Sequence, residues 1–161
     1  VIAGQSIAMA MGLGFASAVD PQNGVQVPVV SQFYMILATL VFLALDGHLL
    51  LLQTIHHSFE LLPIGAQWPR DLAWKIVQWG SQMFVNGLLI ALPALASLLL
   101  VNLAFGVITR SAPQLNIFAV GFPITLLAGF ALILLSLPSF LPLLSGAFES
   151  VFKLIPTLLE P

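Results

Sequence analysis

The sequence predicts an all-α fold of long, kinked apolar helices associated with a membrane, with an amphipathic helix at the C-terminal end. Hydrophobic residues make up 60% of the 161 residues, charged residues only 6%, and the mean hydropathy is +1.09. These values lie far outside the range of ordinary soluble domains. Long charge-free stretches separated by Pro- and Gly-containing turns indicate a few long helices, and we expect residues 1–161 to form a single helical domain.

The same composition excludes several classes of protein. A formal net charge of -2 provides no basic surface for nucleic acid. The absence of cysteine rules out a disulfide framework and a thiolate metal site. The chain opens at Val1 inside an apolar pattern, without a basic leader segment, so we expect it to be a fragment that lacks N-terminal helices.

The first apolar stretch, residues 1–19, carries no charge and is long enough for most of a membrane crossing. Its small residues form two rows with i, i+4 spacing, about 200° apart around a helix. Such rows allow close approach of helix backbones, which predicts either a thin helix packed between two neighbours or a generic crowded transmembrane helix. The first row is Gly4, Ala8, Gly12 and Ala16, and the second is Ser6, Ala10, Gly14 and Ala18.

The next segment, from Asp20 to Ser31, is a long connector. Asp20-Pro21 disfavours the helical region, and Asn23-Gly24 is a turn dipeptide. Pro28 prevents the alternating residues around it from pairing as a central strand. Helix connections usually need about 2 to 8 residues, so a longer connector with an apolar side should pack against something.

A second helix is predicted from Ser31, a plausible N-cap, to Pro63, and it carries Asp46 near its centre. An ionised carboxylate there costs about 2.5 to 3.5 kcal/mol, so it should face protein, water or a cation. One interpretation is a proton-relay or gating group. The other is a buried carboxylate that is bonded to a hydroxyl, a backbone N–H or a cation.

The three histidines do not form a convincing metal site. His56 and Glu60 can share a helix face, but His48 lies about 80° and His57 about 100° away from it, whereas a metal needs three or four converging ligands. We therefore expect no metal and assign these residues to a solvated helix end near the membrane interface.

From Asp71 the chain predicts a long helix, kinked at Pro93, because no charge occurs between Ile76 and Thr109 and one crossing needs only ~20 residues. Amides within this helix need partners that lipid does not supply, so they indicate helix contacts. The polar residues along it are Gln78, Gln82, Asn86, Ser97 and Asn102.

A turn at residues 109–116 leads to a second apolar helix from Ile117 to Leu137, so residues 71–137 form a predicted antiparallel hairpin. Arg110 at its tip marks either a watery or acid-lined location or an ordinary loop arginine. Past Pro138, residues 139–160 have helical spacing of apolar residues and read as an amphipathic tail.

The few cations suggest an orientation in the membrane. Arg70, Lys75 and Lys153 lie near the second turn and in the tail, whereas the Asp20–Ser31 loop has no cation. The positive-inside rule therefore places that loop on the non-cytoplasmic side, with only Arg110 dissenting.

Three motifs of this sequence resemble a known family: "GLGFASAVDPQNG" followed by "SQFY", then "LDGHLLLLQTIHHSFELLPIG", then "GVITRSAPQLNIFAVGFP". Together they resemble the FliR family of flagellar export-gate membrane proteins and its counterparts in type III secretion injectisomes. The resemblance covers essentially the whole chain and corresponds to the larger, C-terminal part of that family.

The resemblance implies a non-enzymatic subunit, without a cofactor, of the flagellar type III protein export gate in the bacterial inner membrane at the flagellar basal body. It would assemble with FliP-like and FliQ-like subunits, contact an FlhB-like protein and membrane lipid, and pass unfolded export substrates. Residues 71–137 would be the FliQ-like hairpin and residues 15–30 a loop that plugs the pore. The plug residues so implied are Phe15, Asp20, Pro21, Gln22, Asn23, Gly24, Val25, Gln26, Val27 and Pro28.

Two other functions remain open from the residues alone. Asp46, the histidines and Glu60 could belong to a proton-coupled small-molecule membrane carrier with a site near the midplane of the bilayer. A purely structural assembly subunit, without a gating part, would have the same composition. Loss of transport on neutralising Asp46 would indicate the carrier, and unaffected sealing after loop deletion would indicate the structural subunit.

Overall fold

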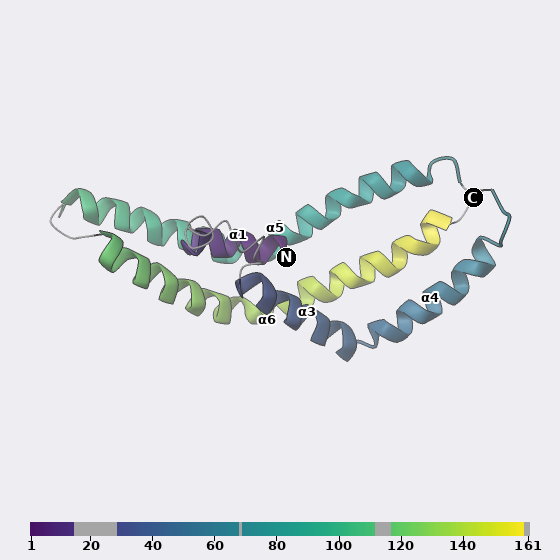
Figure 1. Ribbon diagram of the computed structural model, residues 1–161, viewed down its shortest axis with the longest axis horizontal. Helices are drawn as coiled ribbons and strands as arrows, with labels where there is room; N and C mark the ends of the chain where they lie inside the picture. The colour runs from purple at the N-terminus through teal and green to yellow at the C-terminus, as the bar shows by residue number, and fades with distance from the viewer. Residues whose placement is uncertain (15–28, 68, 112–116, 160–161) are drawn as a thin grey trace, which may run out of the picture. The chain divides into compact units, whose positions relative to one another are not determined.

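A computed structural model describes residues 1–14, 29–67, 69–111 and 117–159, and in this part of the chain every regular element is an α-helix (Figure 1). The prediction of an all-α fold with long apolar helices is confirmed. The helices are α1 (Ile2–Ala10), α3 (Val29–Ala44), α4 (Gly47–Leu61), α5 (Leu72–Ser111) and α6 (Ile117–Leu159).

The two longest helices, α5 and α6, contain 40 and 43 residues. At 1.5 Å per residue each is about 60 Å long, twice the ~30 Å hydrocarbon thickness of a bilayer. Both are long and apolar enough to cross a membrane, and α3 and α4 pass the same test only as a pair bent by 68°. Among the described residues there are thus two candidate spans, or three if the bent pair counts as one.

The chain divides into two compact units, and both long helices contribute to each. The first unit consists of Val1–Met35 and Gly87–Phe140, and the second of Ile36–Asn86 and Leu141–Pro161. The buried residues of the first unit come from α1, the start of α3, the second half of α5 and the first part of α6. They include Ile7, Met11, Val30, Tyr34, Ala94, Leu98 and Ile133.

Helix α1 ends after nine residues in a Schellman motif. The N–H of Gly12 donates to the carbonyl of Met9 at 3.0 Å, and the N–H of Leu13 donates to the carbonyl of Ala8 at 2.9 Å. Gly12 adopts φ 83°, the left-handed conformation that this motif requires. The prediction that one helix continues through residues 1–19 is therefore wrong, because Gly12 terminates the helix.

Three glycines of the first unit mark where α1 meets its neighbours. A Cβ on Gly4 would lie 2.5 Å from the Cα of Ser31 at the start of α3. Gly87 of α5 lies against Ile2, and Gly129 of α6 lies against Met11. The backbone of α1 therefore approaches α3 closely at Gly4, and the side chains of Ile2 and Met11 pack against glycines of α5 and α6.

The start of α3 is held by polar and aromatic contacts. Ser31, which is fully buried, lies within the first turns of α3 and donates its hydroxyl to the carbonyl of Val1 at 3.2 Å. It was predicted as the N-cap, but the helix begins two residues earlier, at Val29. Tyr34 packs on Phe140 of α6 with ring centroids 5.1 Å apart.

In the second unit, the predicted single helix from Ser31 to Pro63 is broken. Helix α3 ends at Ala44 and α4 begins at Gly47, with Asp46 between them at φ 55° and ψ 26°. Asp tolerates this left-handed conformation better than most residues, and Asp-Gly is a common turn dipeptide. The break is consistent with that local chemistry, which the surrounding apolar pattern concealed.

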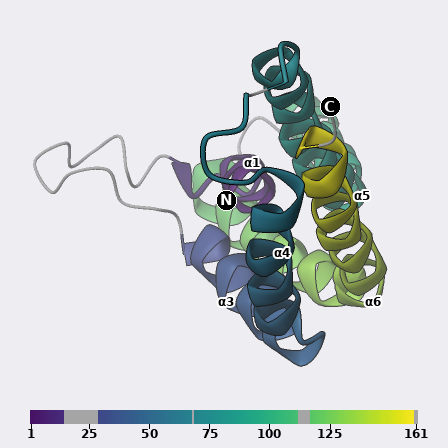
Figure 2. The same cartoon turned by 90° about the vertical axis from the view of Figure 1, so that its right-hand side faces the viewer.

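Helix α4 lies beside the C-terminal part of α6 in both views (Figure 1, Figure 2). Gln53, His57 and Leu61 of α4 line a small cavity together with Ile155 and Pro156 of α6. Closer to the break, Phe42 of α3 packs on Phe148 and Phe152 of α6.

Helix α6 does not end at Leu137 as predicted. It continues through Pro138 and Pro142 to Leu159, so the second helix of the predicted hairpin and the predicted tail are one helix. A proline in a helix interior removes a backbone hydrogen bond and usually bends or ends the helix. Here Phe140 and Leu144 on either side of Pro142 are buried, and this packing favours continuation.

Candidate functional site

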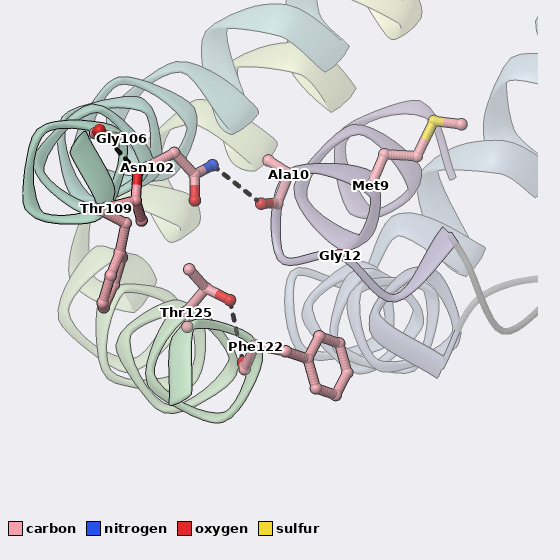
Figure 3. A pocket seen from close by; sticks show the side chains of 10 residues that line it. Met9, Ala10, Gly12, Asn102, Gly106, Thr109, Phe122 and Thr125 are labelled. Atoms are coloured by element: carbon pink, nitrogen blue, oxygen red, sulfur yellow. Dashed lines mark hydrogen bonds between the residues drawn. The ribbon is translucent and has the colours of Figure 1, made fainter. Parts of the chain in front are cut away.

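A cavity of about 670 Å³ opens beside the end of α1 in the first unit (Figure 3). It forms where the last residues of α1 diverge from the second half of α5 and the first half of α6. The Schellman turn contributes Gly12, and a Cβ added to this glycine would lie 3.3 Å from the ring of Phe122. The lining consists of Met9, Ala10, Gly12, Asn102, Phe105, Gly106, Thr109, Gly121, Phe122 and Thr125.

The polar groups of this cavity are engaged with backbone carbonyls. Asn102 donates its side-chain N–H to the carbonyl of Ala10 at 3.5 Å, a long hydrogen bond to one of the last carbonyls of α1 (Figure 3). Thr109 and Thr125 donate their hydroxyls to carbonyls of their own helices at 2.8 and 2.9 Å. What remains is a mainly apolar surface that suits packing of an apolar group more than binding of a polar metabolite.

The described lining of the cavity offers no group for acid–base chemistry, because none of those residues is titratable. Within the described ranges no group of three His, Asp or Glu could hold a metal ion. The contact that the cavity lining makes with the end of α1 is the hydrogen bond from Asn102 to the carbonyl of Ala10.

The predicted packing residues occupy different environments. Gly4 and Ala8 are buried in the first unit, and Asn102 contacts the end of α1. Asn86 is half-buried on α5. Gly12 belongs to the turn after α1, not to a continuing row along it, and Ala16 lies outside the described residues.

The implied pore plug lies outside the described residues. The described chain stops at Gly14, two residues after Gly12 of the cavity wall, and resumes at Val29 at the start of α3. The residues concerned are Phe15, Asp20, Pro21, Gln22, Asn23, Gly24, Val25, Gln26, Val27 and Pro28.

The two charges predicted as buried or gating groups, Asp46 and Arg110, are both exposed. The prediction that Asp46 lies at the centre of an apolar helix is wrong, because it occupies the break between α3 and α4. Arg110 lies in the last turn of α5, where a cation interacts favourably with the negative end of the helix dipole.

His56 and His57 lie near Glu60 at the exposed end of α4. His57 Nδ1 lies 2.8 Å from one carboxylate oxygen of Glu60, and His56 Nε2 lies 3.9 Å from the other. The sequence predicted the pairing of His56 with Glu60, but the shorter contact is made by His57. His48, on the first turn of α4, takes part in no metal-binding group in the described part of the chain.

The aromatic cluster at the break was not predicted from the sequence. Phe42 lies there among Gly47, Phe148 and Phe152. These residues line a second cavity of about 350 Å³ in the second unit. The Asp46-Gly47 dipeptide was the available signal for a turn at this position. The partners on α6 are about a hundred residues further along the chain, and no local pattern identifies them.

Comparison with known protein families shows to which family this chain is related. The family described as "Bacterial export proteins, family 1" matches residues 1–151. The chain belongs to this family. Its curated relatives include the "Flagellar biosynthetic protein FliR" of Pectobacterium carotovorum, which is 44% identical over 158 residues, covering 98% of this chain and 60% of the relative.

Two further family members align with this chain over nearly its whole length. The FliR proteins of Escherichia coli K12 and Bacillus subtilis 168 are 39% and 32% identical, and each match covers 98% of this chain. Those matches cover 61% and 62% of the relatives. This member of the bacterial export proteins, family 1, therefore spans about three fifths of the length of the curated relatives it matches. The predicted resemblance to the FliR family is confirmed.

Proposed function

We propose that this chain is a non-enzymatic subunit of the flagellar type III protein export gate, and that it helps to form and seal the channel for unfolded flagellar proteins. The observation that carries the proposal is membership of the bacterial export proteins, family 1, over residues 1–151, with relatives named as flagellar biosynthetic proteins. The geometry supports a subunit that works by packing, because the described residues that line the cavity beside α1 are mainly apolar and none of them is titratable.

The apolar surface of the long helices supports assembly with other membrane subunits. Leu99, Leu100 and Leu103 are each about two thirds exposed on α5, and Leu135 is 75% exposed on α6. Helices of about 60 Å exceed the ~30 Å that lipid tails can cover, so part of this surface needs protein partners. We assign that role to FliP-like and FliQ-like subunits and to an FlhB-like protein in the bacterial inner membrane at the flagellar basal body.

We further propose that residues 15–30 act as the pore plug, on the non-cytoplasmic side or within the pore. Support comes from the two anchors on either side of them. The end of α1 is fixed by the Schellman motif at Gly12, and the start of α3 is fixed by buried Ser31 against α1. A segment between two firm anchors can block a pore through modest contacts and move aside when a translocating chain competes for the space.

The domain boundaries follow the same proposal. Residues 71–137 correspond to a FliQ-like hairpin, and residues 139–160 to an amphipathic extension of its second helix. A proton-coupled carrier is the weaker alternative, because Asp46, its candidate proton-binding group, lies exposed at a helix break.

The native mass of the detergent-solubilised complex tests the proposal. A full-length protein carrying this chain should purify with several copies of two other small membrane proteins. Recovery only as an isolated chain or a homo-oligomer would refute the export-gate assignment and would favour the carrier. A mixed complex in which Asp46→Asn leaves export intact would strengthen the assignment further.

A further inference from the structure

One charged side chain lies next to the cavity beside α1. Arg110 follows Gly106 of the cavity lining by four residues, so it is displaced by about 40° around α5 and about 6 Å along it. It also directly follows Thr109, which lines the cavity (Figure 3). The long side chain of Arg110 can therefore reach the end of the cavity that Thr109 forms.

Arg110 has no carboxylate partner in the described part of the chain. It is exposed, and it is the only charged side chain among the described residues of the first unit. None of the described ion pairs includes it. Asp20, the one carboxylate in the sequence of the first unit, lies outside the described residues. Within the described chain, the guanidinium of Arg110 is therefore available to an anion.

The cavity itself suits an apolar chain. Its volume is about 670 Å³, and its walls include Phe105 and Phe122. The hydroxyls of Thr109 and Thr125 already donate to carbonyls of their own helices. Water fits poorly in such a site, because an enclosed water needs about two to four hydrogen-bond partners. Met9 and Phe122 are 65% and 45% exposed, so the cavity opens to its surroundings.

The cavity lies close to the end of the uncharged part of α5. No charge occurs between Ile76 and Thr109, and α5 and α6 are both long and apolar enough to cross a membrane. An arginine that ends such a stretch places its guanidinium at the membrane interface. Asn102, the lining residue of α5 furthest from Arg110, is about 12 Å away along the helix. The cavity therefore lies directly below the interface, at the depth where a lipid acyl chain begins.

We infer that Arg110 and the cavity beside α1 form a site for one anionic phospholipid, with the phosphate on Arg110 and an acyl chain in the cavity. A guanidinium binds phosphate through two parallel hydrogen bonds, and basic groups at membrane helices attract anionic head groups. Water alone would solvate Arg110 and leave the apolar walls uncovered. An apolar helix would fill the cavity and leave the charge unmatched, whereas a phospholipid matches both features.

This inference goes beyond the proposed function, because it requires only that α5 and α6 lie in a membrane. Native mass spectrometry of the purified full-length protein in its complex tests it. Phosphatidylglycerol and phosphatidylethanolamine with the same acyl chains are added in turn, and the lipid bound per copy of this chain is counted. We expect one site that prefers phosphatidylglycerol.

Arg110→Gln should raise the concentration of phosphatidylglycerol that half-saturates this site by at least about tenfold, because it removes hydrogen bonds to a charged group. Arg70→Gln is the matched control and should leave the site unchanged. Arg70 is also exposed and forms no described ion pair, but it lines none of the cavities described above.

Two results of this measurement would overturn the inference. One is equal binding of the two lipids. The other is an unchanged half-saturation in Arg110→Gln, as expected if Arg110 pairs with Asp20 or with a carboxylate of another subunit.

A second measurement tests the cavity. Phosphatidylglycerol with a photoactivatable diazirine on its acyl chain should label the peptides that carry Phe105 and Phe122. Gly106→Leu should abolish this labelling, because nothing lies within 4 Å of a Cβ at position 106 and the leucine can occupy the cavity. Gly80→Leu is the control, since its Cβ position is equally open and Gly80 does not line the cavity. Labelling that survives Gly106→Leu, or labelling of other subunits alone, would overturn the inference.

Discussion

Gly47 lies directly against the ring of Phe42, and the place where a side-chain Cβ would sit at position 47 is already occupied by ring carbons. Phe42 cannot easily move aside, because its ring packs on Phe148 at 5.3 Å and on Phe152 at 6.5 Å between centroids. The 68° bend between α3 and α4 is therefore set by side-chain packing as well as by the left-handed backbone of Asp46.

Gly47→Ala should destabilise the assembled protein by about 1 to 3 kcal/mol, because the added methyl overpacks the aromatic cluster. Denaturant unfolding of the purified complex, followed by circular dichroism, measures the effect. Gly146→Ala on α6 is the matched control, because nothing lies within 4 Å of its Cβ position. Adding Phe42→Leu should recover part of the loss, and strictly additive effects would contradict the proposed contact.

Two other glycines should differ in how strictly they are required. A Cβ on Gly4 would lie 2.5 Å from the backbone of Ser31, whereas a Cβ on Gly129 would meet only the flexible side chain of Met11. Gly4→Ala should therefore cost about 2 kcal/mol or more, and Gly129→Ala clearly less, because methionine can change rotamer. The melting temperatures of the two variants in the same detergent check this order. Equal losses would show that α1 can shift away from α3.

The fold class was accessible from the sequence because composition and charge-free length dictate long apolar helices. The helix ends were less accessible. Gly12 fits equally well in a packing row and at a helix end, and only the hydrogen bonds of Gly12 and Leu13 to α1 distinguish the two. Pro138 predicted a helix end by its local chemistry, but burial of Phe140 after it favours a continuous helix.

The candidate site was only partly predictable, because local patterns reveal neither long-range contacts nor which of two conflicting patterns prevails. Asn102 was identified as a helix-contact residue from its polarity, but its partner, the carbonyl of Ala10, lies 92 positions earlier in the chain. Asp46 was placed in a helix because the apolar pattern runs on both sides of it. The local turn signal of Asp46-Gly47 outweighed that pattern in the structure.

The start of α5 should respond to acid through Asp71. A hydrogen bond from Lys75, with its Nζ 2.9 Å from the carboxylate, holds the pKa of Asp71 below its usual value. A lowered pKa means that the contact stabilises the folded state above about pH 4 and loses this contribution as the pH falls through the folded-state pKa. The side chains of Lys75 and Asp71 are 37% and 58% exposed, so solvent screens the contact and the effect on stability should be small.

Carbon-13 NMR of aspartate-labelled protein can follow this carboxylate directly. Lys75→Gln should raise the pKa of Asp71 toward its ordinary value, because it removes the hydrogen bond that lowers it. An unchanged Asp71 titration in this variant would show that the ion pair does not form in solution.

Deletion of residues 20–27 should raise ion conductance in cells that carry the assembled gate, since this removes eight of the ten residues assigned to the plug. Replacement of the same residues by a flexible Gly/Ser segment of equal length should leak as well, because it keeps the connection but loses the apolar contacts. Conductance is measured in cells that carry each variant and in a matched strain without the gate. Unchanged conductance in an assembled, correctly composed complex would contradict the plug assignment.

The contacts of α1 have a consequence for the order in which this protein folds. Its close contacts are with helices that are synthesised later, from Ser31 of α3 to Gly129 of α6. During translation, more than a hundred residues must therefore follow α1 before all of its binding surfaces exist. Such long-range contacts fold slowly and leave apolar chain exposed in the meantime, so we expect a translocon or a partner subunit to protect the nascent chain.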